Sequence, residues 1–229
     1  MKVLSIETSS SSVSAALIVD AEVVGFSVIN LSQLHVETII PLIDSILKLT
    51  KVTKDDLDAV CVDIGPGLFT GLRVGIVTAN TIAKTLSIPI AGITSTEVLA
   101  SSVSDPTDRL VMSILDARRQ EIFYGIYRLG KDGLLENITV NVVNPLNLLS
   151  ELDHLEKYVM VGNLTDEVIQ ILGSNIDYEI CTSCSKFPLA DRLGLLAVTK
   201  NEFKVGEVRP LYLREPDATK SKMKIDGNG

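Results

Sequence analysis

The sequence predicts an α/β protein of two related lobes, each a mixed β-sheet flanked by helices. Short apolar runs with strand composition alternate with segments of helical spacing along the chain. Residues 109–133 repeat the outline of residues 3–25, which is an apolar strand ending in an acid, a polar turn, and an alternating strand. Between the two halves, Pro, Ser and Asp cluster at residues 104–108 and mark a boundary.

We therefore expect an N-terminal lobe over residues 1–104, a C-terminal lobe over 105–216, and a flexible tail over 217–229, where no apolar period continues. An amphipathic helix over 187–203, with Pro188 in its first turn, closes the second lobe. Whether this last helix packs back on the N-terminal lobe stays open.

The N-terminal lobe begins with a predicted β-meander. Strand composition occurs at residues 3–6, 13–19 and 22–29. A serine-rich turn that carries Glu7 and Thr8 joins the first two strands, because hydroxyl side chains favour turns.

Two helices and a buried strand follow. Apolar residues over 34–49 recur at helical spacing on more than one side, which indicates either a contact beyond the lobe or burial within it. The run 57–65 is typical of a strand buried on both faces. A second helix is expected over 71–86, with Thr70 as its cap. On this helix small side chains recur every four residues and allow another backbone to approach closely, namely Gly75, Ala79 and Ala83.

The remaining elements complete the two sheets. A short strand is expected at residues 88–94, directly before a helix-like segment and the boundary. In the second lobe, helices at 145–152 and 165–172 flank a strand at 157–162.

Charge and composition limit the function classes. The chain has 21 basic and 29 acidic side chains, a net charge of −8 and a pI near 4.8, which argues against a protein that grips a nucleic-acid backbone unaided. It has no Trp and only five each of Tyr and Phe, too few for a base-stacking platform. Any nucleic acid would have to be held mainly by a partner.

The apolar runs and the cysteine count indicate the cellular compartment. No run approaches the roughly 18 uncharged apolar residues of a membrane helix, and the apolar run at the N-terminus is too short for a secretory signal. Three cysteines, an odd number, fit a reducing compartment better than a disulfide framework. We expect a cytoplasmic protein without membrane contact.

A metal site is not expected. The two histidines, His35 and His154, lie far apart in the sequence, and Cys181 and Cys184 form a lone CxxC without two further ligands. Neither an HExxH motif nor a GxSxG motif occurs. These absences argue against a metallopeptidase, and we assign no catalytic residue.

The glycine-rich segment GPGLFTGLRVG, residues 65–75, is either a phosphate loop or a tight turn. It lacks the Lys-Ser/Thr pair of a Walker loop and departs from GxGxxG. A phosphate on the amides at the helix start, near Arg73, stays open. A tight connection from strand to helix is favoured, because glycine permits the required backbone angles.

Two acids mark equivalent places in the lobes. Glu7 and Asp116 each end the first strand of a lobe. They either hold hydrated magnesium beside a nucleotide, as a vestigial site that includes Thr8, or are turn acids in contact with solvent. Spacing does not decide between the two.

The segment GPGLFTGLRVG closely resembles the signature GPGSFTGLRIG of the TsaB family. The LSIETS opening, HVETIIPLIDSIL, LDARRQEIFYGIY and VRPLYLREPDA are also similar to family segments, so the likeness covers residues 1–216. Glu7 stands where the family commonly has Asp, and its longer side chain makes a magnesium site less secure. The signature residues are Gly65, Pro66, Gly67, Thr70, Gly71, Arg73 and Gly75.

The resemblance implies a two-lobed fold of the actin-like ATPase superfamily (ASKHA, ribonuclease H-like). It implies a subunit of the bacterial machinery that forms N6-threonylcarbamoyladenosine at position 37 of tRNAs reading codons that begin with A. In that family the subunit has no catalytic metal site and pairs with the related catalytic subunit TsaD, alongside the ATPase TsaE. We expect tRNA contact only through the complex, a homodimer when alone, and no cofactor, with weak or vestigial ATP and magnesium binding left open.

The resemblance also places the partner contact on the two helices at 34–49 and 71–86. The candidate contact residues are His35, Thr38, Ile39, Leu42, Arg73 and Val77. The alternative function is an ATP- and magnesium-dependent phosphotransferase of the same superfamily, which would use Glu7 and Asp116.

Overall fold

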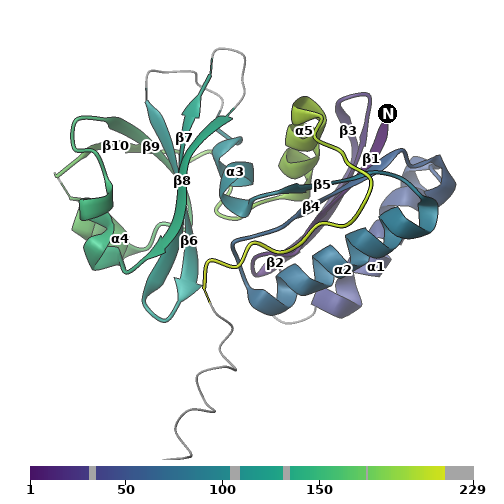
Figure 1. Ribbon diagram of the computed structural model, residues 1–229, viewed down its shortest axis with the longest axis horizontal. Helices are drawn as coiled ribbons and strands as arrows, with labels where there is room; N and C mark the ends of the chain where they lie inside the picture. The colour runs from purple at the N-terminus through teal and green to yellow at the C-terminus, as the bar shows by residue number, and fades with distance from the viewer. Residues whose placement is uncertain (31–34, 104–108, 131–134, 174, 215–229) are drawn as a thin grey trace, which may run out of the picture.

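The described part of the chain forms two lobes, each built on a five-stranded sheet (Figure 1). The predicted boundary at 104–108 and the predicted tail at 217–229 lie outside the described residues. The computed structural model describes residues 1–30, 35–103, 109–130, 135–173 and 175–214.

The first sheet has the strand order β3-β2-β1-β4-β5. β1 pairs antiparallel with β2, and β2 with β3, whereas β4 lies parallel to both β1 and β5. All five residues of β4 are buried, which confirms the strand predicted to be covered on both faces. The strands are β1 (Lys2–Glu7), β2 (Ser12–Val19), β3 (Glu22–Asn30), β4 (Ala59–Asp63) and β5 (Ile90–Ile93).

The second sheet repeats this arrangement in the order β8-β7-β6-β9-β10. β6 and β7 pair antiparallel, as do β7 and β8, while β9 lies parallel to β6 and β10. Each strand thus has a counterpart in the first sheet, which confirms two related lobes with mixed sheets. The strands are β6 (Leu110–Arg118), β7 (Glu121–Leu129), β8 (Leu135–Val143), β9 (Lys157–Gly162) and β10 (Asp177–Ile180).

Helices cover both faces of the first sheet. α1 (His35–Thr50) and α2 (Phe69–Leu86) lie on one face, and α5 (Ala190–Lys200) packs on the other through a separate apolar cluster. The last helix of the second half of the chain therefore lies on the first sheet. Between the lobes, α3 (Ser95–Ala100) contacts β6 and β7.

Three predicted helices differ from the structure. α2 begins two residues before the predicted start, at Phe69, so that Thr70 lies exposed in its first turn and does not cap it. The segment predicted as a helix at 145–152 is the 3₁₀ helix η2 (Pro145–Glu151), and α5 is shorter than the predicted 187–203. A short 3₁₀ helix, η1 (Lys54–Asp56), precedes β4, and α4 (Asp166–Leu172) has the predicted extent with Thr165 as its cap.

Two glycines let α2 approach the turn after β1 closely. A Cβ on Gly71 would lie 2.1 Å from the Thr8 carbonyl oxygen, and a Cβ on Gly75 would lie 2.2 Å from Thr8 Oγ1. The Thr8 hydroxyl donates a hydrogen bond of 2.8 Å to the Gly71 carbonyl. The close backbone approach predicted from the small residues of this helix is confirmed.

The segment 201–214, here called the C-terminal strap, returns from α5 along α2 and β5 toward the second lobe (Figure 1). The Asn80 amide group of α2 exchanges two hydrogen bonds of 3.0 Å with the Val208 backbone, as a neighbouring strand would. Arg214 then bonds Glu121 of β7 at 2.9 Å. The strap therefore connects α2 of the first lobe with β7 of the second lobe.

Candidate functional site

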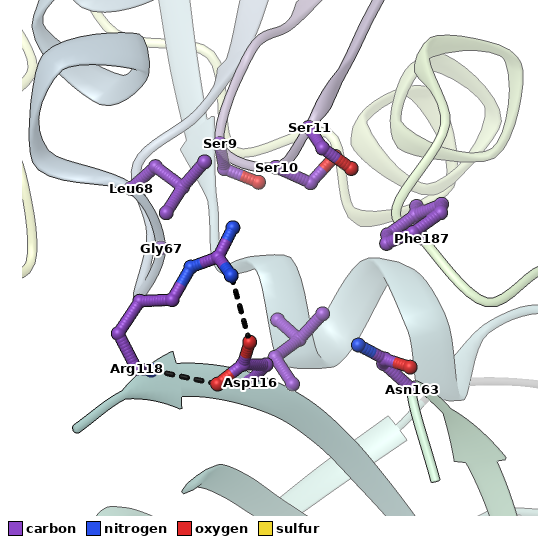
Figure 2. Close-up of a pocket in the computed structure, with 10 residues that line it drawn as sticks. Ser9, Ser10, Ser11, Gly67, Leu68, Asp116, Arg118, Asn163 and Phe187 are labelled. Carbon is purple, nitrogen blue, oxygen red and sulfur yellow. Dashed lines mark hydrogen bonds and ion pairs between the residues drawn. The ribbon is translucent and has the colours of Figure 1, made fainter. Parts of the chain in front are cut away.

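A small cavity lies between the lobes, where a ligand of a two-lobed protein would be held (Figure 2). Its volume is about 130 Å³, whereas sites for drug-sized ligands and cofactors measure about 300–1,000 Å³. The cavity is therefore smaller than such sites. It is lined by Ser9, Ser10, Ser11, Gly67, Leu68, Leu115, Asp116, Arg118, Asn163 and Phe187.

The acid in this cavity already has a cationic partner. The Arg118 backbone N–H donates to Asp116 Oδ1 at 2.7 Å, and the Arg118 guanidinium lies 3.4 Å from Asp116 Oδ2 (Figure 2). Arg118 adopts a positive φ of 63° as the first of three such residues in the turn from β6 to β7. This turn directs the Arg118 side chain back over the Asp116 carboxylate.

The candidate nucleotide and magnesium residues differ in their exposure to the cavity. Asp116 lines it, whereas Glu7 and Thr8 are buried and are not among its lining residues, and Thr8 donates a hydrogen bond to α2. A joint site of Glu7, Thr8 and Asp116 stays a prediction. Across the described ranges, no group of three or more His, Cys, Asp or Glu side chains is placed to hold a metal ion.

Glu7 instead pairs with Asp63, which ends the neighbouring parallel strand β4. The register that sets Ile6 beside Val62 brings the two carboxyl groups together, and Ser9 Oγ lies 2.6 Å from Glu7 Oε1 and 3.1 Å from Asp63 Oδ2. Burial raises the pKa of Glu7 well above its usual value, with a further contribution from the Asp63 charge. Burial also raises the pKa of Asp63 to about 6.

This carboxyl pair anchors the glycine-rich loop. The Gly65 N–H donates to Asp63 Oδ1 at 2.7 Å, and the Leu68 N–H donates to the Ser9 carbonyl at 2.7 Å. Gly65 has a φ of +99°, and a Cβ on Gly67 would lie 2.3 Å from the Ser9 carbonyl oxygen. Both positions require glycine for the backbone path, as in a tight connection between strand and helix.

Aliphatic residues lie exposed on the outward side of α1 and α2. Val36 and Ile40 of α1 expose 66% and 55% of their surface, and Val77 of α2 exposes 63%. The two helices are in contact with each other. We call these three residues together with exposed Arg73 the α1–α2 face.

Several residues predicted to form the partner surface lie inside the lobe. Ile39 and Leu42 are 1% and 6% exposed in the first core cluster, so they do not lie on the surface of this structure. His35 is also buried, with Nε2 at 2.8 Å from the Ser10 carbonyl, and Thr38 is half-buried. Helix periodicity explains the difference. Residues 36 and 40 each follow a buried residue, 35 or 39, and therefore lie about 100° around the helix from it. Arg73 and Val77 do lie on the exposed side.

The sequence model of the TsaD family, tRNA N6-adenosine threonylcarbamoyltransferase, matches residues 22–217. The tRNA threonylcarbamoyladenosine biosynthesis protein TsaB of Bacillus subtilis is 30% identical over 224 residues, which are 95% of this chain and 96% of that protein. The chain belongs to the TsaB family.

Solved structures agree with the fold of the TsaB family. YeaZ from Pseudomonas aeruginosa superposes with a TM-score of 0.76 at 22% identity, over 93% of this chain and 99% of that chain. A ROK family protein from Streptococcus pneumoniae, solved in complex with sucrose, has a TM-score of 0.52 at 9% identity, over 88% of this chain and 100% of that chain. The predicted two-lobed, actin-like ATPase fold is confirmed, and the TsaB family takes part in threonylcarbamoyladenosine modification of tRNA.

The signature segment of the TsaB family also holds an exposed arginine in place. The Arg73 guanidinium lies 3.8 Å from the centre of the Phe69 ring, and Phe69 stacks on Tyr212 of the C-terminal strap at 4.9 Å between ring centres. Arg73 Nε donates to the Tyr212 hydroxyl at 3.2 Å. These contacts hold the Arg73 guanidinium in place at the surface, one helical turn before Val77.

Other findings correct or extend the expectations for this TsaB-family chain. Cys181 and Cys184 form a disulfide, contrary to the reduced thiols expected from the cysteine count, while Cys61 is buried and free. None of the described helices has the length and apolar character to span a membrane. Sequence reasoning missed Asp63, although an acid that ends a buried strand is the same signal that singled out Glu7.

Proposed function

We propose that the protein is a non-catalytic subunit of the complex that forms N6-threonylcarbamoyladenosine at position 37 of tRNAs reading codons that begin with A. It pairs with a TsaD-type catalytic subunit and activates it. The observation that carries the proposal is the α1–α2 face of a TsaB-family chain, where three aliphatic side chains lie exposed on two adjacent helices.

The chemistry of the face suits a protein partner. Complete burial of a Val or Ile side chain contributes roughly 1.5–3 kcal/mol, and Arg is enriched among the residues that dominate interface energies. Arg73 is held by stacking on Phe69, so little side-chain entropy is lost when it binds a partner. Related helices of a TsaD-type subunit are the proposed occupant, and a second copy of this chain takes their place when the protein is alone.

The cavity between the lobes supports a non-catalytic role over a phosphotransferase. Its volume is below that of nucleotide-sized sites, Arg118 lies over Asp116, and Glu7 is not among its lining residues. We propose that no cofactor is required. TsaE and tRNA then engage through the complex, because a net charge of −8 disfavours unaided tRNA binding.

The pairing is tested with the TsaD-type protein of the same organism. Light scattering after size-exclusion chromatography is expected to give a 1:1 heterodimer, and tRNA modification by the TsaD-type protein is expected to rise when this chain is added. Separate elution of the two proteins, with full modification by the TsaD-type protein alone, would refute the proposal.

Nucleotide binding gives a second prediction. Titration of millimolar ATP with magnesium into the isolated protein is expected to release no saturable heat, because the cavity is small and Asp116 is paired. An actin-like protein that binds ATP serves as the positive control in the same calorimeter. A saturable 1:1 isotherm that disappears in Asp116→Asn would favour the phosphotransferase instead.

A further inference from the structure

We propose that Glu7 and Asp63 share a single proton through Ser9, and that this buried relay positions the glycine-rich loop and the start of α2. The inference goes beyond the proposed function, and its tests use the isolated protein. Failure of partner binding would therefore leave it intact, and its own failure would leave the partner proposal intact.

The number of hydrogen atoms available between Ser9 and the two carboxyl groups is the basis for this relay. The Ser9 hydroxyl has one hydrogen, but its oxygen lies within hydrogen-bond distance of both Glu7 Oε1 and Asp63 Oδ2. If both carboxyl groups were ionised, one of the two contacts would join oxygen atoms with no hydrogen between them. A proton on either carboxyl group resolves this: protonated Asp63 donates to Ser9, which donates to Glu7, or protonated Glu7 donates to Ser9, which donates to Asp63.

The other hydrogen-bond donors near the two carboxyl groups already bond to Asp63 Oδ1 and Glu7 Oε1. Asp63 Oδ1 accepts from the Gly65 N–H at 2.7 Å and from the Ser95 hydroxyl at 2.6 Å. Glu7 Oε1 accepts from the Ser9 N–H at 2.6 Å, while Glu7 Oε2 is buried without a hydrogen-bond partner. An unpartnered buried oxygen on a full carboxylate charge is costly, so a shared proton stabilises the pair.

In the described part of the chain, no cation on a neighbouring element bonds to either carboxyl group. On α1, His35 binds the Ser10 carbonyl, and on α3, Glu97 is paired at 2.8 Å with Lys200 of α5. On β7, the Tyr127 hydroxyl lies 2.8 Å from Thr96 Oγ1. Asp191 lies in the first turn of α5, and Arg73 of α2 lies over Phe69 at the surface.

The relay reaches the start of α2 through two short paths. Ser9 accepts a backbone hydrogen bond from Leu68, the residue before α2, and Asp63 accepts one from Gly65. If the shared proton is lost, two buried negative charges repel each other across the Ser9 hydroxyl. Separation of the charges moves Ser9 or Asp63, and each carries one end of the loop with it.

The pH dependence has a definite sign. Unfolded Asp and Glu release their protons near pH 3.9 and 4.3, whereas burial raises the pKa of Asp63 in the folded protein to about 6. Between these values the folded state binds more protons, so stability falls as the pH rises. One retained proton increases the unfolding equilibrium constant about tenfold per pH unit in this window.

Urea unfolding from pH 4.5 to 7.5 tests the shared proton with wild type, the double variant Glu7→Gln/Asp63→Asn, and the exposed control Glu22→Gln. The two amides keep acceptors for Ser9 and Gly65 and remove both titrating groups. We expect the unfolding constant of wild type relative to the double variant to rise about tenfold per pH unit up to about pH 6. Glu22→Gln is expected to follow wild type. Parallel curves for wild type and the double variant would overturn the proposal.

Carboxyl-carbon NMR of the wild-type protein keeps the test independent of whether the double variant folds. One carboxyl group of the pair is expected to titrate near pH 6, and the amide resonances of Gly65 and Leu68 are expected to shift with the same midpoint. Midpoints below about pH 4.5 for both Glu7 and Asp63, near the unfolded values, would overturn the shared proton. Amide resonances of the loop that stay constant through the titration would overturn the positioning role.

Discussion

Val77→Asp is expected to weaken association with the TsaD-type subunit by at least about 100-fold, or about 2.7 kcal/mol. Val77 exposes 63% of its surface, so a carboxylate is well solvated in the free protein and the fold is retained. In the heterodimer the same carboxylate would be buried without a cation or hydrogen-bond donor opposite it, which costs several kcal/mol. Titration calorimetry measures the change, with circular dichroism to verify the fold.

Leu146→Asp is the matched control for this substitution. Leu146 exposes 71% of its surface on η2 in the second lobe, away from α1 and α2. The same change of an exposed aliphatic residue to Asp is expected to leave the affinity unchanged there, while Ile40→Asp on α1 is expected to act like Val77→Asp. Equal affinity for wild type and Val77→Asp would exclude the α1–α2 face as the contact surface.

Gly71→Ala is expected to lower the free energy of unfolding by about 3 kcal/mol or more, in the range of severe core changes. The added Cβ would lie 2.1 Å from the Thr8 carbonyl oxygen, and backbone atoms cannot yield as a flexible side chain can. α2 must then move away from the turn after β1. Thermal and urea unfolding measure the loss.

The sign of this effect is diagnostic, because Gly→Ala in a free helix interior stabilises by roughly 0.5–1 kcal/mol. Thr85→Ala on the exposed side of α2 is the control, and only a small change is expected there. A Gly71→Ala protein as stable as wild type would mean that α2 does not pack on Thr8 as described.

The repeated lobes could be predicted from sequence because the pattern is local. Strand composition, polar turns and the acid at the strand end recur in order, and the two sheets share one topology. The small-residue stripe of α2 likewise predicted a close contact, since only small side chains permit one. The residue that makes this contact, Thr8, could not be found, because helical periodicity does not say which loop lies opposite.

The site was predicted less completely for two physical reasons. α1 is apolar on several sides, so periodicity alone did not separate the core stripe of Ile39 and Leu42 from the exposed residues Val36 and Ile40. The pairing of Glu7 with Asp63 depends on the register of β1 against β4, which are separated by about fifty residues of sequence. Register between parallel strands is a tertiary property that single-sequence patterns do not specify.

Modification of tRNA in a reconstituted mixture tests most directly whether the protein acts through the α1–α2 face or through the cavity. The TsaD-type subunit and the other components are kept constant, and this chain is added as wild type, Val77→Asp or Asp116→Asn. We expect wild type and Asp116→Asn to support the same rate of N6-threonylcarbamoyladenosine formation, and Val77→Asp to support little or none. Full modification with Val77→Asp together with loss in Asp116→Asn would contradict a non-catalytic subunit and indicate chemistry in the cavity.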